Sequence, residues 1–486
     1  MRGRLVVLSG LGVWPAAAQA HPFAPSYTLP VPFWMYAGGT VAALLLSFLA
    51  VGWLSRPASK TPPVRAIGDT KLARVLLGHR AIGVLSTISV LGLLLCIATG
   101  LLGTRSAAFN LNMTLFWIVF VLGFMYLSAI VGNLFAAISP WQRIVEAIGR
   151  AGWLRFDSRV TSTTALDYGP ALALYAGFIV LELFGRAGPR GLGWLLLAYT
   201  VLNVVAAWFW GARAWFARGE FFSVLFARVS LVAPIQLKPE REGPARVERL
   251  SPCGALQGRG ATSNAEVLFV LFMLSSTAFD GLHATQGWAK LFWEDFAALL
   301  APWIGDNIVQ TYPLLSRLFL GWQIAALLLL PLVYLALYGL CLAAMRRITG
   351  CTLSLGELGR RFAYTFVPIA LVYHAAHYAT LLVTQGLMIA RLVSDPFGVG
   401  WNLFGTALWL HRPVVPDMNW VWHTQVGLIL LGHVASVVVA HREALRLFGD
   451  RRGLAMRSQL PMLALMLAFT AFGLWILAQP ITSQPG

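Results

Sequence analysis

Five ionisable residues lie within apolar segments of the chain, and their spacing is suited to chemistry. Asp280 and His283 are three residues apart, His374 and His377 are also three apart, and His433 lies in a later apolar segment. Side chains at i and i+3 share one face of a helix, so each pair can reach a common partner. A charged group in the hydrocarbon region costs roughly 2.5–3.5 kcal/mol, which indicates that these residues have functional or bonding partners.

The expected depths of these residues suggest one or two sites. At about 1.5 Å per residue, the imidazoles of His374, His377 and His433 lie roughly 18–25 Å below the outer helix ends. Asp280 and His283 lie shallower, at roughly 6–10 Å. Because imidazole and carboxylate groups bind zinc and copper, we predict His374, His377 and His433 as metal ligands. Asp280 and His283 are predicted as catalytic proton acceptors, in one elongated site or in a second one.

Two other interpretations of the histidines stay open. Each imidazole can hydrogen-bond a hydroxyl on a neighbouring helix, such as that of Ser276 or Tyr378, with a purely structural role. A haem b could also be held between His374 and His433. Covalently attached haem is excluded because the sequence contains no CxxCH motif.

The composition indicates which elements must position these residues. Of 486 residues, 58% are hydrophobic and only 11% are charged, and the mean hydropathy is +0.72. Soluble proteins carry about 25% charged residues, so a soluble enzyme is excluded. A membrane-spanning helix needs about 20 apolar residues. The sequence therefore predicts an all-α polytopic membrane bundle with about ten spans, near 33–54, 81–103, 113–138, 168–185, 193–211, 267–287, 318–345, 363–391, 421–440 and 459–479.

The distribution of charge predicts an orientation. The chain has 36 Lys and Arg against 19 Asp and Glu, a formal charge of +17. Of the 36 basic residues, 27 fall in the alternate segments 55–80, 139–167, 212–266, 346–361 and 441–458. The positive-inside rule places these segments in the cytoplasm and both mature termini outside. The basic surplus is then a topology signal that also contacts anionic lipid, and no nucleic-acid partner is expected.

The start of the chain has the layout of a cleavable signal peptide. Residues 1–20 combine a basic start, a short apolar run and a final Ala-Gln-Ala. Cleavage would leave His21 at the mature N-terminus, where its amine and imidazole could bind copper. We expect residues 21–211 to form the first five membrane helices, and residues 267–486 to form the last five, with the His/Asp cluster.

The segment 212–266 between these halves is predicted to be cytoplasmic. Residues 213–233 alternate aromatic and charged side chains at helical spacing, which favours a helix in the membrane interface. Residues 234–266 are rich in Pro, Gly, Arg and Glu and predict a flexible loop. On the outer side, residues 394–420 interleave Gly398, Gly400 and Gly405 with aromatic residues, a pattern that permits tight turns or re-entry into the membrane. Glu182 is expected to pair with Arg186, four residues further on.

Several phrases along the chain resemble a bacterial multi-pass membrane family. They are HPF at 21–23, YTLPVPFW at 27–34, STAFDG at 276–281, SDPFGVGWNLFG at 394–405, and the pairs Gly-His at 432–433 and Ala-His at 440–441. Some members of this family are labelled fenitrothion hydrolase, a membrane-bound organophosphate hydrolase subunit. The resemblance extends over nearly the whole chain and implies a protein of the bacterial inner membrane.

The resemblance implies hydrolysis of apolar organophosphate triesters. A metal such as zinc would lower the pKa of a bound water towards ~7 and so supply hydroxide. The apolar substrate would enter from the lipid bilayer, and a second membrane subunit is a further expected partner. Two alternative functions stay open: transport of copper or another divalent metal ion, with His21 as the outer ligand, and a structural role in a membrane assembly.

Overall fold

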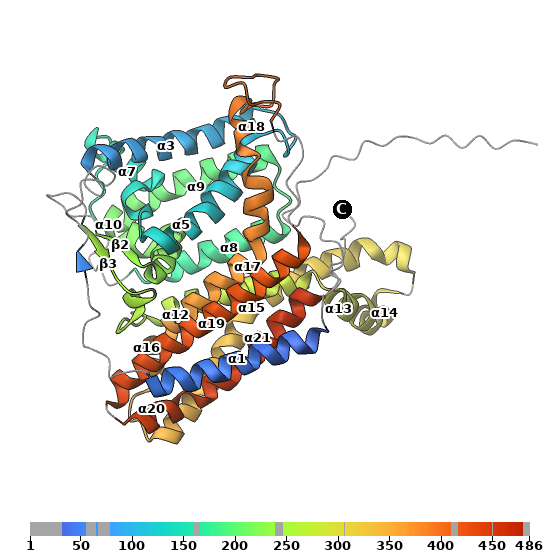
Figure 1. Ribbon diagram of the computed structural model, residues 1–486. Helices are drawn as coiled ribbons and strands as arrows, with labels where there is room; N and C mark the ends of the chain where they lie inside the picture. The colour runs from blue at the N-terminus through green and yellow to red at the C-terminus, as the bar shows by residue number, and fades with distance from the viewer. Residues whose placement is uncertain are drawn as a thin grey trace, which may run out of the picture.

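A computed structural model describes residues 32–54, 65–66, 78–159, 166–238, 246–305, 307–409, 417–449 and 451–479. Helices dominate these ranges, which confirms the predicted all-α membrane bundle (Figure 1). Nine helical stretches in the described part are long and apolar enough to cross a membrane. The predicted signal peptide and His21 lie outside the described residues.

The helices of twenty or more residues are α1 (Phe33–Leu54), α3 (His79–Leu102), α9 (Pro189–Trp210), α12 (Asn264–His283), α15 (Ile308–Thr349), α17 (Val367–Gly386) and α19 (Met418–Phe448). Shorter helices of the first half are α4 (Leu111–Met113), η1 (Thr114–Gly123), α5 (Phe124–Val131), α6 (Phe135–Ile138), α7 (Pro140–Arg150), α8 (Gly169–Phe184), α10 (Ala212–Ala214), η2 (Trp215–Gly219), α11 (Phe221–Val229), η3 (Ser230–Val232) and η4 (Gly254–Leu256). Those of the second half are α13 (Gln286–Lys290), η5 (Leu291–Phe296), α14 (Ala297–Ile304), α16 (Leu355–Phe362), η6 (Ala363–Phe366), α18 (Ile389–Ser394), α20 (Arg452–Ser458) and α21 (Leu460–Ala478).

The fourth predicted span differs from the others in length. Residues 168–185 form α8, which has 16 residues and is about 24 Å long. It is therefore shorter than the roughly 30 Å hydrocarbon core, and it is not among the nine membrane-length helices. Helix α8 packs against α12 and α11 in the interior of the protein.

The bundle has two groups of helices that meet at α12 and α17. On one side α3 packs against α9 and α7, and on the other side α1 packs against α19 and α21 (Figure 1). Helix α12 contacts α8 of the first group as well as α15 of the second, and α17 contacts η1 as well as α19. Residues from both halves of the chain therefore converge along α12 and α17.

The predicted interfacial helix at 213–233 is a buried core element instead. In α11, Phe222, Phe226 and Val229 are almost completely buried. Phe222 stacks on Trp141 with a centroid distance of 5.5 Å, and Phe226 meets Phe135 edge-to-face at 5.0 Å. The prediction was wrong because aromatic residues at helical spacing pack equally well against a lipid surface and against other aromatic side chains.

A buried ion pair ties α11 to α12. The Arg228 guanidinium contacts the fully buried Glu266 carboxylate at 2.5 Å, and the Tyr364 hydroxyl donates a hydrogen bond to the same carboxylate. Thr262 adds a backbone and a hydroxyl donor. Buried charges need such full pairing, because an unpaired ion in the interior is strongly destabilising.

The predicted flexible loop at 234–266 contains ordered structure. Strands β2 (Ile235–Lys238) and β3 (Arg246–Arg249) pair antiparallel, with Gln236 opposite Glu248. Strand β1 (Arg65–Ala66) pairs antiparallel with the other edge of β3, so the sheet order is β1-β3-β2. The charged composition of the loop hid these short strands.

Two glycines allow close packing around α17. A Cβ atom on Gly432 of α19 would lie 2.8 Å from Val372 Cγ1 and closer still to Cγ2. A Cβ on Gly473 of α21 would lie 2.8 Å from Tyr373 Cζ. These distances are well below the normal carbon contact of about 3.5–4.0 Å, so only glycine permits this spacing of the three helices.

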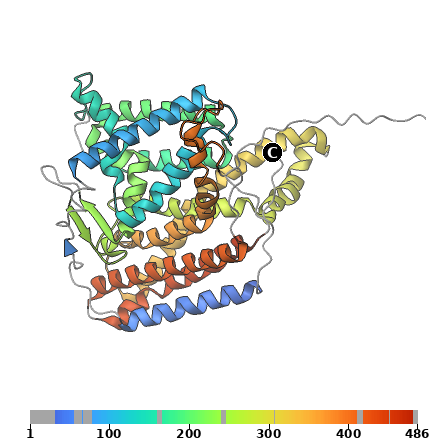
Figure 2. The ribbon, with the colours of Figure 1, turned by 45° about the horizontal axis from the view of Figure 1, so that its top comes forward.

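The expected outer segments have distinct shapes. Gly398, Gly400 and Gly405 all have positive φ angles, of +66°, +95° and +74°, which confirms the predicted tight turns. Helices α13 and α14 project from one end of the bundle together with the first part of α15 (Figures 1 and 2). Aromatic side chains of α13 and η5 pack on α15, as where Trp288 stacks on Trp322 at 4.2 Å.

Candidate functional site

The last turns of α12 carry Asp280 into the protein interior. Ser263 caps the start of this helix by accepting a hydrogen bond from the Glu266 backbone N–H, and the helix then continues to His283. Asp280 is 1% exposed. His283 Nδ1 donates to the Asp280 backbone carbonyl at 2.7 Å, and its ring stacks on Phe279. His283 thereby caps the end of its own helix, with Nδ1 3.8 Å from Asp280 Oδ1.

The Asp280 carboxylate connects α12 to α17. His377 Nε2 lies 2.9 Å from Asp280 Oδ2. The Tyr378 hydroxyl donates to the same oxygen atom at 2.5 Å. Two adjacent residues of α17 therefore converge on one buried carboxylate, and the negative charge of Asp280 stabilises the protonated form of His377.

Glu182 of α8 joins this group. Its carboxylate lies close enough to Tyr378, Asp280 and His377 to interact with them electrostatically. The described ion pairs do not include the predicted pair of Glu182 with Arg186. Sequence spacing along one helix favoured that local partner, whereas the packing of α8 on α12 turns the carboxylate inward.

His374 lies beside this group but has different neighbours. Its Nδ1 atom is 3.3 Å from the Tyr126 hydroxyl, and its ring packs on Tyr378 at 4.7 Å. Tyr126 follows η1, a ten-residue π-helical stretch that packs on α17. Because a π-helix has a wider turn, it shifts the side chains that follow it relative to an α-helix. No sequence pattern predicts Tyr126 as a partner of His374.

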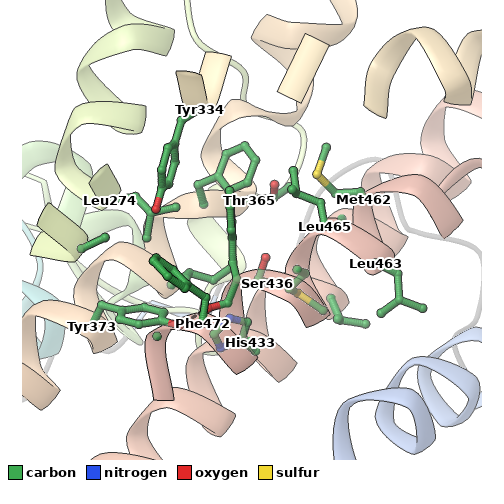
Figure 3. A pocket seen from close by; sticks show the side chains of 18 of the residues that line it. Leu274, Tyr334, Thr365, Tyr373, His433, Ser436, Met462, Leu463, Leu465 and Phe472 are labelled. Carbon is green, nitrogen blue, oxygen red and sulfur yellow. Dashed lines mark hydrogen bonds between the residues drawn. The ribbon is translucent and has the colours of Figure 1, made fainter. Parts of the chain in front are cut away.

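His433 of α19 faces a cavity. Its Nδ1 atom donates to the Ile429 carbonyl at 2.7 Å, so the lone pair of the neutral ring is on Nε2. His433 is 1% exposed and lines the cavity beside Ser436 (Figure 3). It also meets the ring of Tyr373 edge-on at 5.8 Å.

The cavity has a volume of about 80 Å³ and lies between α12, α15, α17, α19 and α21. Both His377 and His433 line it. Its remaining wall is mostly apolar and aromatic and includes Phe469 as well as Leu274, Tyr334, Met462 and Phe472 (Figure 3). Each water needs roughly 10–15 Å³, so the space holds several waters or a small apolar group with water.

The expected metal centre is not assembled. Across the described ranges, no three His, Cys, Asp or Glu side chains are grouped so that they could hold a metal ion. His374 turns to Tyr126, while His433 turns to the cavity, and His377 turns to Asp280. Because His374 and His433 turn to different neighbours, they do not face each other as the alternative of a haem held between them requires. His21, the fourth predicted ligand, lies outside the described residues.

The arrangement that does form is suited to proton transfer. His377 and Asp280 make a dyad in which a buried carboxylate orients an imidazole, and His433 presents a second imidazole to the same cavity. No family model, curated protein or solved structure matches this chain. The case for a function therefore depends on this geometry and on the sequence phrases that include Asp280 and His433.

Proposed function

We propose that this protein is an integral membrane hydrolase of apolar organophosphate triesters. The observation that carries the proposal is the shared cavity of His377 and His433, with Asp280 paired to His377 at 2.9 Å. The mostly apolar wall suits one apolar arm of an aryl phosphotriester that has partitioned into the bilayer, and the lining helices must separate to admit the whole ester, because the cavity is only about 80 Å³. The resemblance noted above adds support, because Asp280 and His433 lie in two of its phrases.

In the proposed reaction, the two imidazoles have opposite roles. The Nε2 lone pair of His433 accepts a proton from water as the water oxygen bonds to phosphorus. The bond from phosphorus to the aryl oxygen then breaks, and the protonated His377 donates its proton to the leaving aryloxide. Asp280 stabilises the positive charge of His377 before this transfer. The described residues do not fit a bound metal, so no step is assigned to one.

The proposal includes a location. The signal-like residues 1–20 and the basic alternate segments support a location in the bacterial inner membrane with both mature termini in the periplasm. An apolar ester would then reach the cavity from the lipid, between the helices that line it. A second membrane subunit stays an expected partner.

The test measures nitrophenolate release from a 4-nitrophenyl phosphotriester by the protein in lipid vesicles. His433→Gln and Asp280→Asn should each lower kcat by at least about a hundredfold, since general acid–base groups contribute roughly 10²–10⁴. His423→Gln is the matched control, because His423 lies on the same helix α19 but is exposed and bonds the Asn419 carbonyl. Full turnover by inserted, folded His433→Gln protein would refute the proposal.

A second candidate function is proton-coupled transport. It is favoured by the chain of buried polar groups from Glu182 through Tyr378 and Asp280 to His377, which crosses from α8 to α12 and α17. Such carboxylate and histidine chains occur in proton relays. In proteoliposomes with an imposed pH gradient, transport predicts a faster decay of the gradient for the native protein than for Asp280→Asn. Equal decay rates would exclude this function.

A further inference from the structure

A second cavity lies at the opposite end of the bundle from α13 and α14. It is a cleft of about 710 Å³ between the turn that joins α15 to α16, helix α16, and the region where α19 ends and α20 begins. By the distribution of basic residues, this end faces the cytoplasm. The cleft is separate from the cavity of His377 and His433, and it shares no lining residue with it.

Three arginines line the cleft. Arg360 and Arg361 belong to α16, and Arg451 precedes α20. Arg361 is 46% exposed, and its nearest acid is Glu443, with Nε and Oε1 3.8 Å apart. Arg360 donates a hydrogen bond to the neutral Asn264 side chain. Both guanidinium groups therefore keep donors for another anion.

Among the described lining residues, Glu357 is the single acidic side chain, and it is already engaged. Glu357 accepts hydrogen bonds from the Ser354 backbone N–H at 3.0 Å and from its hydroxyl at 2.8 Å, in the capping box that starts α16. Over these described residues, three positive charges and one negative charge leave the cleft net positive. Arginine forks match phosphate oxygens in geometry and charge.

The cleft also has apolar lining residues. They are Leu353, Leu447, Phe448 and Leu454. A free inorganic anion gains nothing from these side chains, whereas a phospholipid presents a phosphate and acyl carbons side by side. From this combination we propose that the cleft binds the phosphate of an anionic phospholipid headgroup in the cytoplasmic leaflet.

The test follows the thermal unfolding of detergent-purified protein as phosphatidylglycerol, phosphatidylcholine or inorganic phosphate is added. A ligand that binds the folded state raises the unfolding temperature in a saturable way. Each basic residue near an anionic lipid contributes a factor of about five in affinity. Arg360→Gln with Arg451→Gln should therefore raise the half-saturating phosphatidylglycerol concentration by about thirtyfold, and Arg451→Gln alone by about fivefold.

The matched control removes two exposed arginines elsewhere on the same predicted side. Arg150→Gln with Arg155→Gln should leave the half-saturating concentration unchanged, because neither residue lines the cleft. Stabilisation by phosphatidylcholine equal to that by phosphatidylglycerol, or no difference between Arg451→Gln and native protein, would overturn the proposal. Saturation by inorganic phosphate alone, with no further effect of the lipid, would reassign the site to a free phosphate compound. The measurement uses no substrate, so its outcome is independent of the proposed hydrolysis.

Discussion

The close approach of α19 to α17 at Gly432 makes a quantitative prediction. In Gly432→Ala the new methyl group would lie 2.8 Å from Val372 Cγ1 and 3.0 Å from Val372 Cβ. Overpacking of this kind costs about 1–3 kcal/mol, of which the better helix propensity of alanine offsets about 1 kcal/mol. We expect a net loss of up to about 2 kcal/mol in the free energy of unfolding. The new methyl group should also push α19 away from α17. Because His433 follows Gly432 directly, this displacement should enlarge the cavity and lower the rate of hydrolysis.

A double-mutant cycle measures this contact directly. Val372→Ala removes both Cγ atoms and leaves the Cβ atom at 3.0 Å as the nearest neighbour of the new methyl group. In Val372→Ala with Gly432→Ala, the two changes should compensate, with a coupling of about 1–2 kcal/mol, within the range usual for contacting residues. The assay is reversible unfolding of the purified protein in mixed micelles of increasing SDS content, followed by circular dichroism.

A glycine on the same helix provides the control. A Cβ atom on Gly427 would meet nothing within 4 Å, so Gly427→Ala should be neutral or stabilising by up to about 1 kcal/mol. If the effects of Val372→Ala and Gly432→Ala simply add, within about 0.5 kcal/mol, the two helices do not meet at Gly432 and the packing argument is refuted.

Three further predictions concern buried polar groups. Glu266→Gln should lower the free energy of unfolding by about 3–5 kcal/mol, because it leaves Arg228 buried without its counter-charge. Glu146→Gln, which removes the partly exposed pair with Arg143, should lower it by at most about 1 kcal/mol. Unfolding of both variants in SDS tests this, and equal effects would contradict it. Burial raises the pKa of the Cys253 thiol to about 11. The rate of its alkylation by iodoacetamide should therefore rise about tenfold per pH unit between pH 9 and 10.5. A rate that levels off near pH 9, as for an ordinary thiol, would contradict the burial of Cys253. Tyr378→Phe removes a hydroxyl donor from the buried Asp280 carboxylate. It should lower the free energy of unfolding by about 1–3 kcal/mol and also lower the rate of hydrolysis. If both stay unchanged, the Tyr378 hydroxyl is not part of the site.

The sequence predicted the fold class and the helices that carry the candidate site. Long apolar runs identify membrane helices because only helices satisfy their backbone in lipid, and nine of the ten predicted runs recur as helices of membrane-spanning length in the described residues. The spacing of His374 and His377 correctly placed both on one helix. It could not show that they diverge, because their partners, Tyr126 and Asp280, come from helices whose rotation is set by packing.

The parts that the sequence missed share one cause. Nearly uniform apolar helices carry no polar face that fixes which side turns inward, so the inward turn of Glu182 depends on how α8 packs on α12. Helix α11 resembled an interfacial helix because aromatic residues spaced among charges suit a membrane surface and a protein core alike, and only its packing against neighbouring helices shows that Phe222 and Phe226 are buried. The closeness permitted by Gly432 is likewise a property of two helices together.

The length of α15 has a mechanical consequence. This helix runs unbroken for 42 residues, about 63 Å, and so is about twice as long as the hydrocarbon core is thick. Tyr334, near the middle of α15, lines the cavity. Tyr312, about 33 Å away along the helix, stacks on Trp293 of η5. A rigid rod pivoting by about 5° at the first residue moves the second by about 3 Å. A tilt of α15 about the cavity wall would therefore be amplified at the end of the helix that carries Tyr312.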